Sequence, residues 1–232
     1  MELKIADFND PQAILSGTHA QEWARLERAL REMPLHLKSS DQAGKQGSLI
    51  FDVKGTNAYI KACLAHSGWQ AARIPPEHDF LGIDVDFAKS GVILEVQFSN
   101  YPFLLNNLLR SELFFREKVR FDGVPMICVV IVVKAGMFPS SNSTLYYEQA
   151  LRQLNGLASY KLFSVPIRLV GLFSPIRKGV PANFTTYSAD RYARTVDRTS
   201  PIVCDVASGR GGRCSITKAL RPNRKGSHST GA

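Results

Sequence analysis

The segment IDVDFAKSGVILEVQFSNYPFLLNN, from Ile83 to Asn107, alternates polar and β-branched residues and contains closely spaced carboxylates. Asp86 ends one β-branched run, and a second run carries Glu95 and Gln97 two residues apart. Because successive side chains of a strand point to opposite faces, Glu95 and Gln97 share one face and the apolar residues of that run share the other. We therefore predict a β-hairpin that brings Asp86 close to Glu95.

The polar face of this hairpin has the composition of a metal-dependent nuclease site. A carboxylate on one strand and a carboxylate with an amide on the next can converge on Mg²⁺, which prefers oxygen ligands and keeps several waters. Ser99 continues the polar face, and Asn100 follows where the strand ends. The alternative is an ordinary hairpin whose polar face is solvated. The short pattern does not by itself distinguish the two.

Similarity to a known family extends over about residues 1 to 196 and is carried by five blocks. The blocks are MPLHLKSSDQAGKQGSLIFD (33–52), DFLGIDVDFAKSGVILEVQFSNYPFLLNNLLRSELF (79–114), MFPSSNSTLYYEQALRQLNGLA (137–158), VPIRLVGL (165–172) and TTYSADRYARTV (185–196). In order and spacing they resemble the BglII family of type II restriction endonucleases, within the PD…(D/E)xK nuclease superfamily. The resemblance implies an α/β fold, with a restriction-endonuclease-like mixed β-sheet flanked by helices.

The resemblance also implies partners and a reaction. It implies a homodimer that cuts a palindromic double-stranded DNA site with Mg²⁺, and a cognate DNA methyltransferase that protects the host site. The target implied by the matching residues is AGATCT, cut after the first A, with a relaxed GATC-centred site as the second choice. Two other functions stay open: a repair or structure-specific nuclease on the same scaffold, and a sequence-specific DNA-binding protein without catalysis. The extended similarity disfavours the first, and the intact acidic motif disfavours the second.

Individual roles follow from the same resemblance. It implies that Asp86 and Glu95, with the main-chain carbonyl of Val96, bind one or two Mg²⁺ ions, and that Asp84 is a possible supporting acid. Gln97 stands where the superfamily usually has Lys, so it can only hydrogen-bond and would orient the attacking water.

DNA contacts are a second group of implied roles. They fall on Ser99, Asn100, Arg110, Asn142, Ser143, Tyr192 and Arg194. These residue types suit the task, because Asn can bond an adenine edge bidentately and Arg suits guanine or phosphate. For Asn142 and Ser143 the alternative is that they cap the following helix.

One segment departs from the family next to the predicted site. WQAARIPPEH (69–78) has Ala71 and Ala72 where the related enzyme has consecutive Asn residues. Alanine has no hydrogen-bonding side chain, so the positioning of water that an Asn there would provide has no counterpart in this stretch.

Length and charge indicate one domain followed by a basic extension. The chain has 232 residues, 44% of them hydrophobic, and a formal net charge of +9, so it can bury a core and suits a polyanionic partner. Residues 198–232 contain seven Arg or Lys and one acidic residue. We predict an endonuclease domain over residues 1–197 and a partly disordered extension over residues 198–232 that attracts phosphates without reading sequence. The alternative for the extension is a plain solubilising end.

Signals for zinc binding, secretion and membrane insertion are missing from the sequence. The four cysteines show no CxxC spacing, and the five histidines are scattered. The start MELKIADFND has acidic residues where a signal peptide would be basic and then apolar, and no run is long enough to span a bilayer. We expect a cytoplasmic protein.

Hydrophobic periodicity predicts the elements around the hairpin. Helices are expected over residues 18–34, 55–69, 102–120 and 145–158. MICVVIVV (126–133) has no polar alternation and is expected to be a strand buried on both faces, and VPIRLVGL (165–172) another buried strand. Residues 185–196 are expected to form a short strand or loop rich in Tyr and Arg.

Overall fold

A six-stranded mixed sheet carries the predicted hairpin. The computed structural model describes residues 1–140, 144–189, 194–207 and 214–219. Across the large sheet the strands are β1 (Glu2–Phe8), β10 (Ile167–Phe173), β9 (Cys128–Lys134), β6 (Val92–Val96), β5 (Asp84–Lys89) and β4 (Gln70–Arg73). The β10–β9 and β9–β6 pairs are parallel and the other pairs are antiparallel. The mixed sheet and the hairpin predicted from the sequence are both present.

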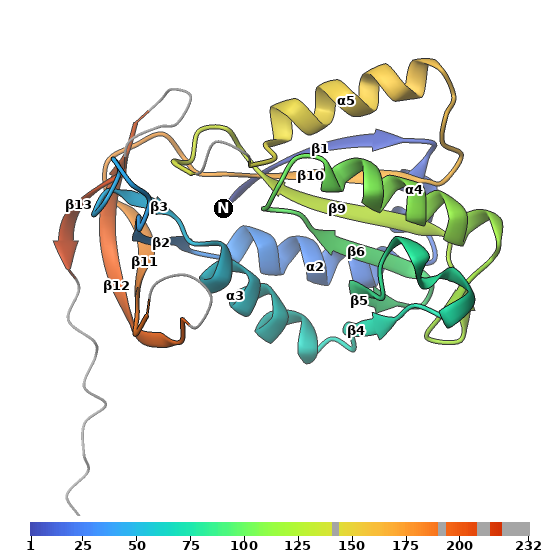
Figure 1. Ribbon diagram of the computed structural model, residues 1–232, viewed down its shortest axis with the longest axis horizontal. Helices are drawn as coiled ribbons and strands as arrows, with labels where there is room; N and C mark the ends of the chain where they lie inside the picture. Colours follow the sequence, from blue (N-terminus) through green and yellow to red (C-terminus); the bar gives the residue numbers. More distant parts are fainter. Residues whose placement is uncertain (141–143, 190–193, 208–213, 220–232) are drawn as a thin grey trace, which may run out of the picture.

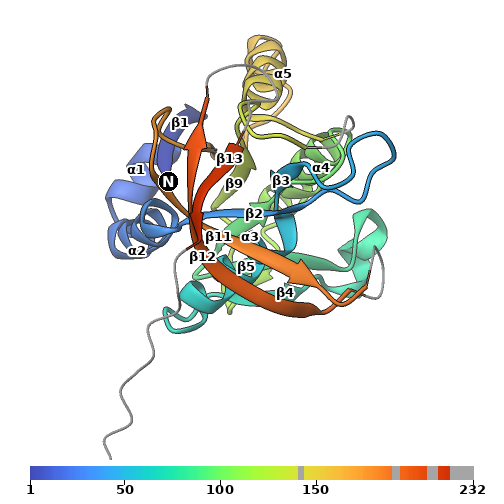
Figure 2. The same ribbon diagram turned by 90° about the vertical axis from the view of Figure 1, so that its left-hand side faces the viewer.

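Helices flank both faces of this sheet (Figures 1 and 2). They are α1 (Pro11–Ser16), α2 (Ala20–Glu32), α3 (Val53–Ala65), α4 (Phe103–Arg116), α5 (Tyr147–Ser159) and the short 3₁₀ helix η1 (Pro76–Leu81). Two helices end earlier than predicted, because Gly68 (φ 79°) and Lys118 (φ 53°) adopt left-handed conformations that a helix cannot continue through. No helix in the described ranges is long and apolar enough to cross a membrane.

The centre of the large sheet is fully buried, as the unbroken apolar runs predict. Every residue of β9 and β10 is buried. Trp23, Leu26 and Leu30 of α2 contribute to the same hydrophobic core at helical spacing. Burial of each such large apolar side chain contributes roughly 1.5–3 kcal/mol, so the sheet edge near Asp86 and Glu95 is attached to the most firmly packed part of the molecule.

A five-stranded sheet lies at one end of the larger one, and Figure 2 views the molecule from that end. Its order is β13 (Cys214–Ala219), β12 (Val196–Val206), β11 (Val180–Tyr187), β2 (Leu35–Ser39) and β3 (Leu49–Phe51). The β11–β2 pair is parallel, whereas β12 pairs antiparallel with both β11 and β13.

This sheet corrects the predicted start of the C-terminal extension. A boundary between residues 197 and 198 would fall inside β12, and β13 pairs with that strand. The composition of the tail concealed a period-two pattern, because Ile202, Cys204 and Val206 are buried while their neighbours are more exposed. Strand pairing therefore continues to residue 219, and residues 220–232 lie outside the described ranges.

Candidate active site

A tight turn sets the geometry of the hairpin that carries the predicted carboxylates. β5 and β6 pair antiparallel, with Phe87 opposite Leu94. Ser90 (φ 49°) and Gly91 (φ 82°) form the turn, and a Cβ atom on Gly91 would lie 2.4 Å from the carbonyl oxygen of Pro125. The close approach explains why glycine is required there.

Asp86 is fixed against the end of β6. The backbone N–H of Val96 donates to Oδ2 of Asp86 over 2.8 Å. The surrounding protein partly desolvates the Asp86 carboxyl and raises its pKa, while the Val96 N–H and the nearby Arg110 act in the opposite direction. The carboxylate is thus held in one orientation beside a main-chain segment that also carries Glu95.

Glu95 is buried directly behind this position, with only 2% of its surface exposed. Burial raises its pKa to about 7, the positive charge of Arg110 opposes that rise, and the neighbouring Asp86 adds to it. Nη2 of Arg110, from α4, donates to Oε1 of Glu95 over 2.5 Å. The hairpin therefore brings two carboxyl groups together in a site where both are harder to ionise than in water.

Arg110 is placed differently from a residue that faces DNA. Its side chain is 9% exposed, and its Nη1 donates to the carbonyl oxygen of Asp84 over 2.9 Å while Nη2 holds Glu95. In this arrangement Arg110 braces the acidic pair, and its contact with DNA stays a prediction. Asp84 itself lies further out, with Oδ1 3.6 Å from Nη1 of Arg73.

Gln97 uses both ends of its amide within the protein. Nε2 donates to Oγ of Ser99 (2.9 Å) and to the carbonyl oxygen of Asn100 (3.3 Å), and Oε1 accepts from Nδ2 of Asn107 (3.3 Å). Its residue surface is 8% exposed. The contacts show that Gln97 holds the Ser99–Asn100 segment in place, a role that the sequence pattern did not indicate.

A cavity of about 590 Å³ opens beside Asp86. Asp84, Asp86 and Val96 form its wall on the sheet side, and Asn57 and Lys61 of α3 face them. Ala71, which stands where the resemblance implies an Asn, lines the same cavity. The cavity wall is therefore apolar at this position.

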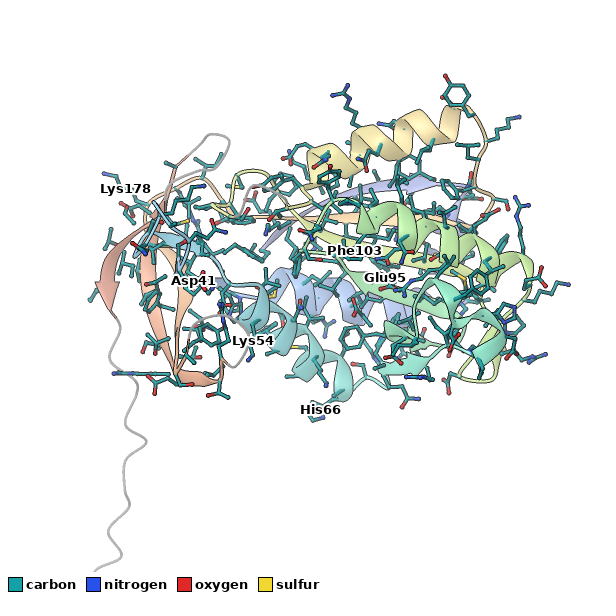
Figure 3. All side chains as sticks on the ribbon, viewed as in Figure 1. Asp41, Lys54, His66, Glu95, Phe103 and Lys178 are labelled. Atoms are coloured by element: carbon teal, nitrogen blue, oxygen red, sulfur yellow. The ribbon has the colours of Figure 1, made fainter. Side chains whose placement is uncertain are left out.

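A second cavity of about 490 Å³ adjoins the first, because Asn57 lines both. Four basic residues (Lys38, Lys54, Lys134 and Arg194) and two acidic residues (Asp41 and Asp52) line it, together with Ser99 and Asn100, so its lining is basic on balance. Figure 3 shows Lys54 and Asp41 toward the smaller sheet and Glu95 over the larger one. The structure thus brings three of the predicted DNA-contact residues (Ser99, Asn100 and Arg194) to one basic cavity.

Comparisons with known proteins agree with this site. The model of the restriction endonuclease BglII/BglIII family matches residues 3–172. The chain belongs to the BglII/BglIII restriction endonuclease family. It is 49% identical over 203 residues to the type II restriction enzyme BglII of Bacillus subtilis, which covers 87% of this chain and 90% of the relative.

Solved structures give the same result for the fold. A crystal structure of BglII complexed with a DNA 16-mer matches with a TM-score of 0.89 and 46% identity, covering 93% of this chain and 100% of the other. The structure of free BglII matches with a TM-score of 0.74 and 43% identity, at the same coverage. The predicted restriction-endonuclease fold is confirmed, and the chain is a type II restriction endonuclease.

Three predicted residues of this BglII-family enzyme lie outside the described ranges, namely Asn142, Ser143 and Tyr192. The alternative role of Asn142 and Ser143 as helix caps concerns the same residues and also lies outside the described ranges. Arg194 is described, and its Nη2 donates to Oδ2 of Asp41 over 2.6 Å.

Sequence reasoning missed the three lysines of the basic cavity, Lys38, Lys54 and Lys134. Lys134 ends an apolar strand and is 1% exposed, with Nζ 3.4 Å from the carbonyl oxygen of Phe98 and 5.2 Å from the ring centroid of Phe51. Burial lowers its pKa to about 8. The sequence did indicate an unusual position for Lys134, because a lysine is rarely fully buried at the end of an apolar strand unless it has a binding partner.

Proposed function

We propose that this BglII-family enzyme uses Mg²⁺ to hydrolyse both strands of a palindromic DNA site with a GATC core. The favoured site is AGATCT, cut after the first A. One observation supports the proposal most strongly. Asp86 lines a cavity that adjoins, at Asn57, a basic cavity, and Glu95 lies buried beside Asp86 behind that cavity wall. A phosphodiester chain bound along the cations would bring a phosphate to the carboxylates.

The donor set suits Mg²⁺. Asp86 and Glu95 would hold the ion with the Val96 carbonyl oxygen and waters, since Mg²⁺ is commonly bound by one or two carboxylates and keeps several waters. Among the described residues, no third His, Cys, Asp or Glu side chain joins them. When bound, Mg²⁺ lowers the pKa of a coordinated water and offsets charge on the phosphate. Arg110 keeps Glu95 oriented, and its positive charge favours the ionised carboxylate that a cation requires.

Base reading would come from the segment that Gln97 holds. Ser99 and Asn100 line the basic cavity, and Leu145 N–H donates to the Ser99 carbonyl oxygen over 2.9 Å. An asparagine amide can pair with an adenine edge, and a hydroxyl can serve base or backbone. Fixed side chains at this position discriminate between bases because a mismatched base leaves their polar groups unpaired.

An apolar surface supports assembly as a homodimer. At the start of α4 and beside η1, large apolar side chains are 42–70% exposed, namely Phe80, Ile83, Tyr101, Phe103, Leu105 and Leu109. Monomeric proteins rarely leave such clusters open to water. A second copy related by two-fold symmetry would cover this surface and supply the active site for the other strand of a palindrome. Replacing Leu109 by Asp should give a monomer in analytical ultracentrifugation.

The cellular setting follows from the reaction. An enzyme that cuts a short sequence would cut the host genome, so we propose a cognate methyltransferase that modifies the same site. Because the methyltransferase would have to protect host DNA from an endonuclease present in the same compartment, we propose a cytoplasmic location.

Digestion of a sequenced plasmid with purified protein and Mg²⁺ tests the proposal directly. Mapping the fragment ends would give the site and the cut position, and the Glu95→Ala protein is the matched inactive control. We expect ends only at AGATCT, absent without Mg²⁺ and absent from plasmid methylated at that site. Ends spread over unrelated sequences, or cleavage confined to branched or damaged DNA, would contradict it.

A further inference from the structure

One face of α3 provides a wall of the active-site cavity that the family motif does not include. Asn57, Lys61 and Ala65 follow one another at intervals of four residues, and all three line the cavity opposite Asp84 and Asp86. Residues four apart on a helix lie on the same face. Asn57 and Lys61 therefore line the cavity from one face of α3, and Asp84 and Asp86 line the same cavity from β5.

Three other polar side chains near the carboxylates (those of Arg110, Arg73 and Gln97) already have partners. Arg110 holds Glu95 and the Asp84 carbonyl oxygen, and Arg73 lies 3.6 Å from the Asp84 carboxylate. Gln97 binds Ser99, Asn100 and Asn107 through its amide. For Lys61, by contrast, no hydrogen bond or ion pair is formed with any residue in the described part of the chain.

The reaction needs positive charge on that side of the cavity. Attack of water forms a bond from its oxygen to phosphorus and breaks the bond from phosphorus to the leaving oxygen, which takes a proton. Negative charge builds on the non-bridging oxygens as this happens. Gln97 replaces the usual lysine and is neutral, and Ala71 offers only a methyl group.

We propose that Lys61 is a catalytic residue that contacts a non-bridging oxygen of the scissile phosphate, with Asn57 beside it as a hydrogen-bond donor to the same phosphate or to the attacking water. The inference rests on the proposed function, and it identifies Lys61 as the source of the positive charge that Gln97 does not supply. Lys61 is exposed, so its ammonium group stays solvated in the free protein. Entry of DNA would displace that water and strengthen the attraction to the phosphate.

Single-turnover cleavage of an AGATCT duplex tests this assignment. Lys61→Ala and Lys61→Met should each lower the rate constant by about 100-fold, as removal of one positioned donor to a developing oxyanion does. Lys61→Arg, which keeps the charge, should recover a large part of the rate. Asn57→Ala should have a smaller effect in the same direction. Arg28→Ala is the matched control, because Arg28 is an exposed helical cation on α2 that lines neither cavity.

Two further measurements distinguish catalysis from folding or binding. Duplex affinity with Ca²⁺ and the melting temperature should change little in the Lys61 variants.

Several outcomes would overturn the proposal. Wild-type rates in Lys61→Ala, an equal loss of binding and rate, or no recovery with Lys61→Arg would each remove Lys61 from the reaction. These results require a wild-type enzyme that cuts the duplex. A wild-type enzyme that cuts no site would instead refute the proposed function, so the two failures are distinguishable.

Discussion

The two cavities beside α3 share Asn57 but differ in charge and in how the chain builds them. The first has the carboxylates of Asp84 and Asp86, two residues apart on one strand, and residues of α3 in its lining. The second gathers cations from β2, α3, β9 and the segment before β12. An acidic, strand-built site suits cation-dependent chemistry, and a basic site assembled from distant segments suits holding a polyanion. The contrast separates cutting from binding, and each prediction below tests one side of it.

The largest effect is expected on the acidic side. Glu95→Ala or Asp86→Ala should lower cleavage by about 1,000-fold or more, because each removes a proposed metal ligand on which the chemical step depends. Binding of the AGATCT duplex in Ca²⁺ should fall far less, since the cations line the other cavity. Single-turnover kinetics and fluorescence anisotropy would measure the two quantities.

Glu95→Gln is the matched control for packing, because it keeps the shape and removes the charge. It should be as inactive as Glu95→Ala while melting closer to the wild type. Retention of a tenth of the wild-type rate in any of these variants would remove the residue from the mechanism.

In the basic cavity, the buried charge of Lys134 should lower the free energy of unfolding. Its pKa is lowered to about 8 by burial, so below that pH the folded protein holds a desolvated charge that the unfolded chain holds in water. Lys134→Met should therefore raise the free energy of unfolding near pH 7 by up to about 3 kcal/mol, given 1.36 kcal/mol per pKa unit. The gain should shrink as pH rises above 8 toward the unfolded pKa. Denaturant titrations at two pH values would measure it.

Binding measurements complete the test of Lys134. If the lysine is kept for DNA, the stabilised Lys134→Met protein should bind the duplex more weakly, as in other trade-offs between stability and function. A variant that is more stable and binds normally would show that the cation does not serve DNA binding.

The same contrast explains what could be predicted from sequence. Asp86, Glu95 and the turn between them are close in the chain, and period-two alternation is a local rule, so the hairpin was predictable. The unbroken apolar run predicted β9 for the same reason. The basic cavity depends on tertiary placement, and its lysines have no spacing to detect. The β12–β13 pair was missed because charge composition outweighed a weak alternation.

A smaller and position-specific effect is expected in the segment that Gln97 holds. Asn100→Ala should lose discrimination at one base pair of the site, by about 1–3 kcal/mol. Gln97→Ala should weaken discrimination indirectly, because it releases Ser99 and Asn100 and leaves Asn107 without its acceptor. Competition binding in Ca²⁺ against duplexes with single substitutions would separate the two. Equal losses on every duplex would reassign Asn100 to a structural role.

The smallest effect is expected from the end of the chain, and the structure defines where to cut it. A truncation before Ser208 would remove β13, whose pairing with β12 covers Ile202–Val206, so that protein should lose stability as well as charge. A truncation after Ala219 removes only residues 220–232, with Arg221, Arg224 and Lys225. Three cations that meet only phosphates should change the slope of log affinity against log salt by at most about 3. Anisotropy titrations over a range of salt concentrations, on AGATCT and on an unrelated duplex, should show the same reduction for both. A changed preference between the two duplexes would mean that the terminal residues take part in base reading. That result would contradict the assignment of base reading to the basic cavity and of non-specific phosphate contact to the end of the chain.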